Sequence, residues 1–351
     1  MKKIAVFFFI FSISGIYAQI VTIPDSNFKN ALLGHDPVID TNSDGEIQVS
    51  EAEAVTHLQV FSKNINSLVG IESFVNLVIL NCSFNNLTEL DITALNQLED
   101  FRCDANELTS LDVSQNDSLT SLNCESNMLS VVNVTHNENL ESLFCGFNPI
   151  TSLDISQNPN LFGLWCSNTG ITELDTSQNP NLLGAYIQEN QLISLDFRQN
   201  PIINLVWCYN NNLEFLDVRS GSNSTMFAML ADGNPNLTCI AVDDVDYSNS
   251  QPCGFPSGWC KDDTAVYDAT CGLSIDENTI SKIVLYPNPV SETLYLGGDN
   301  PYETLFIYSI QGNLLMETKK TEIDVSTLTS GVYFVKAFGK GTSITTQFIK
   351  N

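Results

Sequence analysis

The chain has 351 residues, of which 43% are hydrophobic, and its formal net charge at pH 7 is −27. This hydrophobic content is typical of a folded protein, and the length predicts several modules rather than one ordinary domain. Between residues 19 and 274 we count 33 acidic and 6 basic side chains. Such an excess of negative charge repels phosphate groups and argues against nucleic acid as a partner.

Residues 1–18 have the pattern of a secretory signal peptide. Lys2 and Lys3 precede an apolar run from Ile4 to Ile16. A run of about a dozen apolar residues is too short to span a bilayer as a helix, although a membrane anchor is the alternative interpretation. We therefore expect an exported mature protein without a transmembrane segment.

Residues 40–51 have the spacing of a calcium-binding loop. Side chains that carry oxygen stand at loop positions one, three and five, Gly45 permits a tight bend at position six, and a carboxylate able to chelate with both oxygens ends the loop. The expected ligands are Asp40, Asn42, Asp44, Glu46 through its carbonyl, Gln48 directly or through water, and Glu51.

This motif resembles a single EF-hand loop, and a dockerin loop is a near relative. The resemblance implies Ca²⁺, which we expect to serve as a structural ion in a cap of the next module. Short helices are expected over Ser26 to Leu33 before the loop and Ser50 to His57 after it. The alternative is a turn rich in Asp and Asn that binds nothing.

A 21-residue unit then recurs from about Leu77 to Val218. Between Leu119 and Leu129 it reads Leu-x-x-Leu-x-Cys-x-x-Asn-x-Leu, and Ile187 replaces the cysteine once. The cysteine position is filled at intervals of 21 residues by Cys82, Cys103, Cys124, Cys145 and Cys166, and two intervals later by Cys208. Such a period is the signature of a solenoid in which each unit forms one coil.

The pattern inside the unit predicts a short strand. In Leu-x-x-Leu-x-Cys the last three residues alternate between core and solvent, so the strands of successive coils stack as a parallel sheet. A second apolar set, such as Leu108, Leu111 and Val113, indicates another extended segment per coil and little or no α-helix. Recurring asparagines can bond the backbone where each strand ends: Asn85, Asn106, Asn127, Asn148, Asn190 and Asn211.

These units resemble leucine-rich repeats of the short 21-residue bacterial type, over about half of the chain. The resemblance implies a mainly β fold in which the coils form a curved solenoid. It also implies that the strand face binds a partner, but it does not name that partner. The first coil, which includes Leu58 and Val60, departs from the consensus, and the calcium-loop region is the natural cover for its open end.

One outward column of the predicted sheet indicates a binding site. Counted along the repeats, the outward residue of each strand reads Asn81, Arg102, Asn123, Phe144, Trp165, Tyr186 and Trp207. Consecutive coils thus expose aromatic rings, and Phe162 and Leu183 lie in the adjacent column. Exposed aromatic patches with polar rims mark interaction sites, where indole rings stack on sugars or fill protein pockets. The alternative is that the rings pack on one another or under the C-terminal segment.

The 10 cysteines fall into two groups. Those at the repeat position are expected to be buried free thiols, because parallel side chains in register do not reach the disulfide dihedral angle. Cys239, Cys253, Cys260 and Cys271 lie in a loop-rich segment of an exported chain and predict two disulfides, for which three connectivities exist. Our preferred pairs are Cys253 with Cys260 and Cys239 with Cys271, and a zinc site is the alternative.

From Ile275 on, short strands alternate without the period. Phrases such as Ile283 to Val290 and Leu305 to Tyr308 predict about seven strands and a small β-sandwich. Their order, closed by Phe348-Ile349-Lys350, is similar to that of the C-terminal sorting domain of type IX secretion substrates in Bacteroidetes. The resemblance covers residues 279–351. It implies passage through the outer membrane by the type IX machinery, with the domain removed during secretion or surface attachment.

The sequence thus predicts five parts. They are a signal peptide at 1–18, an EF-hand-like N-terminal cap with short helices at 19–54, a leucine-rich repeat solenoid at 55–250, a cysteine-containing C-terminal cap and linker at 251–278, and an Ig-like β-sandwich, the sorting domain, at 279–351. The histidines His35, His57 and His136 are isolated and no phosphate loop or nucleophile motif is present, so we expect no catalysis.

The predicted function is that of an exported, non-catalytic binding or adhesion protein of the bacterial cell surface or medium. It would recognise a protein or a glycan on its strand face. The alternative is a glycan-binding accessory module of a polysaccharide-degrading system.

Overall fold

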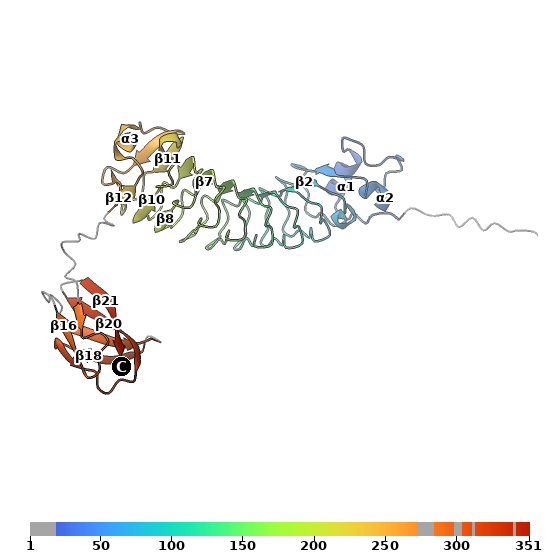
Figure 1. Ribbon diagram of the computed structural model, residues 1–351. Coiled ribbons are helices and arrows are strands. Elements are labelled where there is room, and N and C mark those ends of the chain that lie inside the picture. Colours follow the sequence, from blue (N-terminus) through green and yellow to red (C-terminus); the bar gives the residue numbers. More distant parts are fainter. Residues whose placement is uncertain (1–18, 272–283, 298–303, 311–312, 340–341) are drawn as a thin grey trace, which may run out of the picture. The chain divides into compact units, whose positions relative to one another are not determined.

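The computed structural model describes residues 19–271, 284–297, 304–310, 313–339 and 342–351. The chain divides into two units, Met1–Cys271 and Gly272–Asn351, each with its own hydrophobic core (Figure 1). The predicted signal peptide at 1–18 and the boundary predicted at residue 279 lie outside the described residues. In the described part of the chain, no helix has the length and apolar character needed to cross a membrane.

The first unit is a gently bent β-solenoid with a ten-stranded parallel sheet along one side (Figure 1). Neighbouring strands pair one coil apart, for example Leu122 opposite Leu143. The strands are β1 His57–Gln59, β2 Ile79–Asn81, β3 Asp100–Arg102, β4 Ser121–Asn123, β5 Ser142–Phe144, β6 Gly163–Trp165, β7 Gly184–Tyr186, β9 Leu205–Trp207, β11 Ala228–Ala231 and β13 Gly258–Lys261. The stacked coils that the repeat pattern predicted are thereby confirmed.

A second parallel sheet covers the other side of the last coils. It consists of β8 Ser194–Asp196, β10 Phe215–Asp217, β12 Cys239–Ala241 and β14 Val266–Asp268, in the order β14-β12-β10-β8. Among the described residues the second apolar segment therefore forms a hydrogen-bonded ladder only in these coils. Because β13 pairs with β11 and β14 with β12, both sheets continue past residue 250, where we expected the solenoid to end. Helix α3, Val245–Ser250, lies within the same region.

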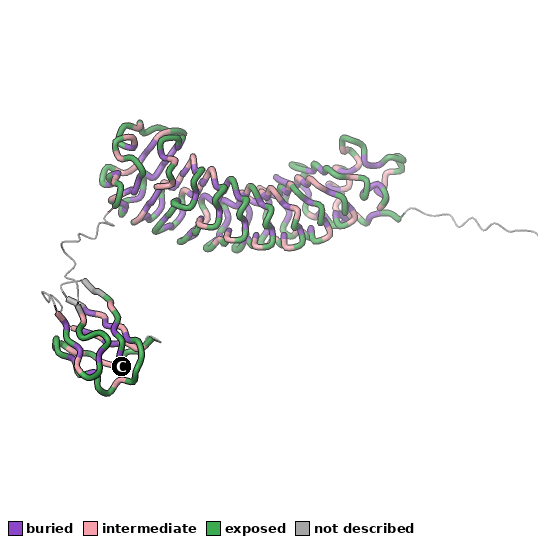
Figure 2. Tube along the Cα trace, in the orientation of Figure 1, coloured by how far each residue is buried: buried purple, intermediate pink, exposed green. Residues whose placement is uncertain are grey.

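The coil interior is filled by the leucines and cysteines of the repeat, and buried residues run through every coil (Figure 2). The predicted asparagines satisfy the backbone there. Asn106 donates through Nδ2 to the carbonyls of Cys82 at 3.1 Å and Cys103 at 3.0 Å, and its Oδ1 accepts from the N–H of Leu87 at 3.0 Å. The bonds to Cys82 and Leu87 cross to the previous coil and hold the strand ends in register.

Both predictions about the cysteines are confirmed. The six repeat cysteines are buried and free, and burial raises the pKa of the Cys124 thiol to about 12. The disulfides are the preferred pairs: Cys239–Cys271, with α-carbons 5.5 Å apart, and Cys253–Cys260, with α-carbons 4.6 Å apart. The first links the chain after β14 to β12, and the second closes the loop that precedes β13.

Two short helices precede the first coil. Helix α1 spans Ser26–Leu33, the predicted range, and buries its inner face against the solenoid core. Helix α2 spans Val49–Ala52 and is shorter than predicted, because the chain from His57 on pairs with β2 as the first strand of the sheet. Between the coils the structure has two single 3₁₀ turns, η1 Ile71–Ser73 and η2 Asn223–Thr225.

The second unit contains two antiparallel sheets, ordered β15-β16-β19 and β18-β17-β20-β21. The strands are β15 Val284–Tyr286, β16 Thr293–Gly297, β17 Thr304–Ser309, β18 Leu314–Thr318, β19 Glu322–Asp324, β20 Gly331–Gly339 and β21 Thr342–Lys350. Residues of both sheets, such as Leu294, Ile307 and Val335, share one core. Two sheets around a common core agree with the predicted sandwich.

Candidate binding face and calcium loop

The strand register sets the predicted aromatic residues side by side. Phe144 of β5 lies opposite Trp165 of β6, Trp165 opposite Tyr186 of β7, and Tyr186 opposite Trp207 of β9. Neighbouring strands lie about 4.8 Å apart, so the row of rings runs about 14 Å across the sheet. We call these four residues the aromatic column.

The rings of the column cover one another. Phe144 and Trp165 stack with centroids 4.0 Å apart and planes 10° apart, and Trp165 and Tyr186 stack at 5.0 Å and 11°. Tyr186 meets Trp207 edge to face at 5.0 Å. The rings therefore pack on one another, as the alternative interpretation expected. All four side chains are nevertheless only half-buried and keep part of their surface exposed to solvent. Trp165 has both faces occupied and presents its ring edge outward.

A glycine on the same strand makes room for the indole of Trp165. A Cβ added to Gly163 would lie 2.4 Å from Cζ3 of Trp165, which is too close for any contact. A Cβ on Gly184, the equivalent residue of β7, would lie 3.4 Å from Cε2 of Tyr186, an ordinary contact. Trp165 thus lies back along its strand over Gly163, and only a residue without a side chain fits beneath it.

The two residues predicted beside the column are in place. Phe162 is 48% exposed and Leu183 is half-buried. They belong to neighbouring coils, since the N–H of Leu183 donates to the carbonyl of Phe162 at 2.8 Å. They widen the apolar surface of the column on one side.

The structure adds two aromatic residues that sequence reasoning missed. The ring of Phe255 lies 5.1 Å from that of Trp207 and is 74% exposed, and the ring of Tyr209 lies 6.5 Å from Trp207. Phe255 stands in the loop that the Cys253–Cys260 disulfide closes. The repeat spacing could have pointed to Tyr209, but Phe255 lies outside the repeats and gave no signal.

Towards the N-terminus the outward column of the strands is polar. Arg102 pairs with Asp100 of its own strand at 2.9 Å, between Asn81 and Asn123 of the neighbouring strands. Arg102, Asn81 and Asn123 line a shallow hollow of about 240 Å³ together with Phe61, Ser83, Phe84 and Asp104. The outward column of the strands thus changes from polar side chains in the first coils to aromatic rings in the later coils, although the hollow at the polar end also exposes Phe61 and Phe84.

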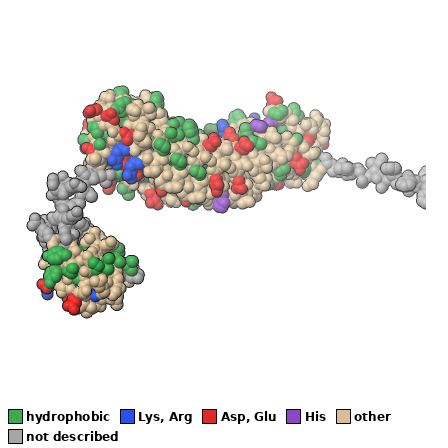
Figure 3. Space-filling view, viewed as in Figure 1, with side chains coloured by type: hydrophobic (Ala, Val, Ile, Leu, Met, Phe, Trp, Pro, Cys, Tyr) green, Lys and Arg blue, Asp and Glu red, His purple; other side chains and the backbone are tan. Residues whose placement is uncertain are grey.

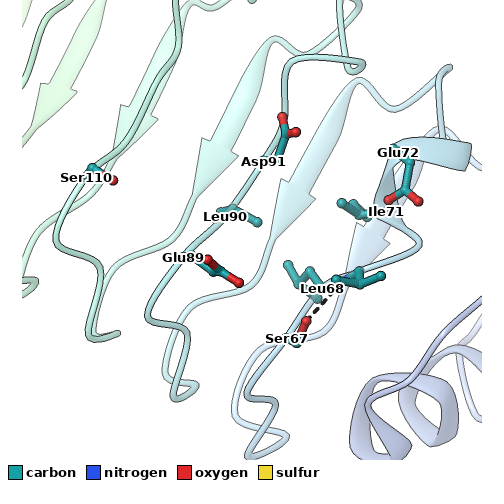
Figure 4. A pocket seen from close by; sticks show the side chains of 9 residues that line it. Ser67, Leu68, Ile71, Glu72, Glu89, Leu90, Asp91 and Ser110 are labelled. Carbon is teal, nitrogen blue, oxygen red and sulfur yellow. Dashed lines mark hydrogen bonds between the residues drawn. The ribbon is translucent and has the colours of Figure 1, made fainter.

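A larger hollow, of about 480 Å³, lies off the strand face near the N-terminal end (Figure 4). Two of its carboxylates are engaged, because Glu72 accepts from the N–H of Gly70 at 2.8 Å and Asp91 from that of Thr93 at 3.0 Å. The lining residues are Ser67, Leu68, Val69, Ile71, Glu72, Glu89, Leu90, Asp91 and Ser110, none of them aromatic. The aromatic surface that marks a binding face is absent from this hollow.

The aspartates that recur once per coil have a structural partner. Asp112 accepts from the N–H of Ser114 and Asp154 from that of Ser156, each at 2.9 Å, and these bonds lower the pKa of both carboxyl groups. At the C-terminal end the fully buried Asp217 accepts from the N–H of Arg219 at 3.0 Å in the same way and also pairs with its guanidinium. Acidic side chains are spread along the solenoid and basic ones are few on the face shown in Figure 3.

The predicted calcium loop folds back on itself. Asp40 accepts through Oδ2 from the N–H of Gly45 at 3.0 Å, and Asp44 accepts through Oδ1 from that of Glu46 at 2.8 Å. Gly45 has φ +80°, the left-handed bend that the motif requires. The side chain of Glu46 turns away to Lys29 at 2.6 Å, which leaves its carbonyl as the available oxygen.

The remaining predicted ligands join the loop from either side. Glu51, at the start of α2, accepts from the N–H of Thr41 at 2.7 Å and from that of Gln48 at 3.0 Å. Gln48 donates to Asp44 at 2.9 Å, and Asn42 donates to Gln48 at 3.0 Å. In the part of the chain that the structure describes, no three His, Cys, Asp or Glu side chains converge on one metal position. The ligand set is assembled in one network, but its oxygens face N–H donors.

Residues 284–351 match the family described as a secretion system C-terminal sorting domain. This match indicates export to the cell surface or the medium and handling by the secretion machinery. A search of curated proteins found no match.

Among solved structures, the chain is similar to internalin C2 of Listeria monocytogenes strain 4b F2365. The identity is 19% and the TM-score is 0.51, over 62% of this chain and 93% of that one. The functional domain of InlJ from Listeria monocytogenes, described as including a cysteine ladder, is 19% identical with a TM-score of 0.49, over 95% and 99% of the two chains. The leucine-rich repeat protein LIC12759 of Leptospira interrogans is 18% identical with a TM-score of 0.32, over 51% and 59%. The likeness to internalin C2 agrees with a solenoid of stacked coils, so the chain combines a solenoid fold like that of leucine-rich repeat proteins with a C-terminal part that matches a secretion sorting domain.

Proposed function

We propose that this protein is an exported, non-catalytic binding protein of a Bacteroidetes cell surface or its medium, which recognises a protein or glycan ligand on the strand face of its solenoid. The single observation that carries this proposal is the aromatic column, a row of half-exposed rings aligned across consecutive strands. The match of residues 284–351 to a secretion system C-terminal sorting domain supports the export of such a protein, for which we propose a signal peptide at 1–18 and the type IX route.

The solenoid holds the column rigidly, which favours binding. Each ring stands on a strand whose neighbours are fixed by backbone pairing, so little conformational freedom is lost when a ligand arrives. Tryptophan side chains frequently dominate binding energy when they are central in an interface. Trp165 and Trp207 are the proposed anchors, each contributing about 2 kcal/mol.

Calcium is proposed as a structural ion of the loop at residues 40–51. Asp40 and Glu51 are buried in the same loop as Asp44, and Lys29 beside the loop already pairs with Glu46. A bound cation would offset the charge of these carboxylates. When bound, Ca²⁺ would crosslink the loop and α2; the residues themselves supply a bend at Gly45 and a network that holds their oxygens within one loop.

The experiment that tests the binding face uses the double variant Trp165→Ala and Trp207→Ala. Wild type and variant are compared on a glycan array and in pull-downs from purified surface proteins of host or neighbouring cells. We expect the bound ligand to lose affinity by more than a hundredfold, while circular dichroism and thermal melting show an intact solenoid. An unchanged affinity with the fold intact would place the site elsewhere.

A further inference from the structure

The geometry of the aromatic column restricts what can bind to it. Sugar recognition by aromatic residues uses a free ring face, on which the C–H groups of a sugar lie. Trp165 has no free face, because Phe144 covers one side and Tyr186 the other at interplanar angles of 10° and 11°. Trp207 meets Tyr186 edge to face and Phe255 at an interplanar angle of 47°. Around Trp165 the column therefore presents a ridge of ring edges.

A ridge of ring edges, flanked by the exposed Phe162, fits apolar side chains and the rim of a protein groove. One ring face does remain without an aromatic neighbour, at the N-terminal end of the column. There the residue opposite Phe144 is Asn123 of β4. The charged side chains around this uncovered ring face therefore affect what can bind to it.

A carboxylate without a partner stands beside that end. A Cβ added to Gly146 would lie 3.2 Å from Oε1 of Glu125, so the carboxylate of Glu125 leans across the coil that carries Phe144. It forms no hydrogen bond or ion pair within the described residues. Burial, and next the charge of Asp104, raise the pKa of Glu125.

The solenoid has few basic side chains with which to pair this carboxylate. Residues 19–274 carry 33 acidic and 6 basic side chains. Five of the six are already engaged: Lys29 with Glu46, Arg102 with Asp100, Arg198 with Asp196, Arg219 with Asp217, and Lys261 with the carbonyl of Ala265. A positively charged partner is the complement of this face.

We propose that the occupant of the strand face is the basic surface of a partner protein, which places a lysine or arginine between Phe144, Glu125 and Asp104 and apolar side chains along the ring edges. This inference rests on the proposed function and narrows its ligand from protein or glycan to protein. Cation–π attraction at the free face of Phe144 and charge pairing with Glu125 act on the same group.

The probe is a phage-displayed library of random dodecapeptides selected on the full-length protein, with a glycan microarray as the parallel arm. We expect the enriched peptides to combine Lys or Arg with apolar residues. Their affinity should fall at least about tenfold in Trp165→Ala and in Glu125→Gln, and it should weaken as salt is added.

The matched control for charge is Asp154→Asn. It also removes one negative charge but lies off the strand face, and an asparagine still accepts the N–H of Ser156. Its affinity should equal that of wild type. Equal affinities in Glu125→Gln and Asp154→Asn, or enriched peptides without basic residues, would overturn the proposal.

The other outcomes separate this inference from the proposed function. A glycan that binds on the array and loses binding in Trp165→Ala would keep the site but refute a protein partner. Peptides or glycans that bind Trp165→Ala as well as wild type would refute the site itself. A selection that enriches no peptide against this face would also overturn a protein partner.

Discussion

The hydroxyl of Thr176 donates to Oδ1 of Asn200 at 2.8 Å. This bond gives the amide oxygen of Asn200 a donor that the corresponding asparagines of the preceding coils lack. Asn200 belongs to a second column of fully buried asparagines, each of which donates through Nδ2 to carbonyls of the previous coil. In four members of that column Oδ1 has no hydrogen-bond partner: Asn116, Asn137, Asn158 and Asn179. A buried acceptor without a donor costs about 1–3 kcal/mol.

A threonine in the right place should recover part of that cost. Val134 precedes Asn158 by 24 residues, the separation of Thr176 from Asn200. Because threonine has nearly the shape of valine, Val134→Thr should place a hydroxyl against Oδ1 of Asn158. We expect a gain of about 1 kcal/mol in the free energy of unfolding, measured by urea titration.

The control is Val206→Thr, at a buried strand position away from this column. There the new hydroxyl has no unpaired acceptor to bind, so we expect the free energy of unfolding to fall by about 1–2 kcal/mol. Thr176→Val should likewise be destabilising. If Val134→Thr costs as much as Val206→Thr, the unpaired amide oxygen is satisfied in some other way.

The packing of the Trp165 indole on its strand can be tested without altering an aromatic residue. In Gly163→Ala the new methyl group would lie 2.4 Å from Trp165, so the indole must leave the stack. We expect the near-ultraviolet circular dichroism of the column to weaken and ligand affinity to fall, with little change in thermal stability. Gly184→Ala, whose methyl group would make an ordinary 3.4 Å contact, should behave as wild type. Equal spectra for the two variants would mean that Gly163 does not support the indole.

Calcium should stabilise the N-terminal region. A ligand that binds only the folded state adds about 2.7 kcal/mol at a free concentration a hundred times its Kd. We therefore expect EGTA to lower the melting temperature of the wild type. Glu51→Ala should be less stable in either condition, because it also loses bonds to Thr41 and Gln48, and should show no response to EGTA.

Glu53→Ala is the control for this experiment, since Glu53 is exposed and outside the expected ligand set. It should respond to EGTA as the wild type does. Identical melting of the wild type with and without EGTA, together with no heat of calcium binding by titration calorimetry, would refute the site.

Acid should loosen α1 from the first coil. Partial burial would raise the pKa of Asp25, but N–H groups of Phe28, Asn66, Asn27 and Ser67 outweigh it and lower that pKa. A folded-state pKa below the unfolded value of about 3.9 means that the stabilisation is present above that value. It is lost as pH falls through the folded-state pKa.

The free energy of unfolding of this region should therefore decrease between about pH 5 and pH 2. Asp25→Asn keeps a good N-cap but carries no charge, so its stability should change less over that range. Asp36→Asn, an exposed aspartate, is the comparison and should keep the wild-type pH dependence. The same slope for all three proteins would exclude Asp25 as the cause.

Removal of residues 279–351 should separate folding from export. The two units have separate cores, and each coil contacts only its neighbours, so the truncated solenoid should fold normally by circular dichroism. Without the sorting domain we expect it to accumulate in the periplasm, which cell fractionation measures. Normal surface display of the truncated chain would contradict the sorting role.

Much of the fold could be predicted from the sequence, because the same pattern of core and surface positions recurs in every repeat. The recurrence of Leu-x-Cys every 21 residues required a parallel stack, and the structure pairs Trp165 with Tyr186 as counting along the repeat demanded. The free thiols followed from the same regularity. Near residue 250 the repeat spacing no longer helped to predict where the solenoid ends, and strands β13 and β14 were missed.

What the sequence determined by itself was the order of residues on each face, since alternation along a strand decides which side chains point outward. Only the tertiary structure decided how those side chains meet. The stacking of Phe144 on Trp165, the approach of Phe255 to Trp207 and the lean of Glu125 over Gly146 depend on rotamers and on a loop outside the repeats. A period in sequence fixes positions along the backbone, whereas ring orientation and contacts between distant segments are settled by packing in three dimensions.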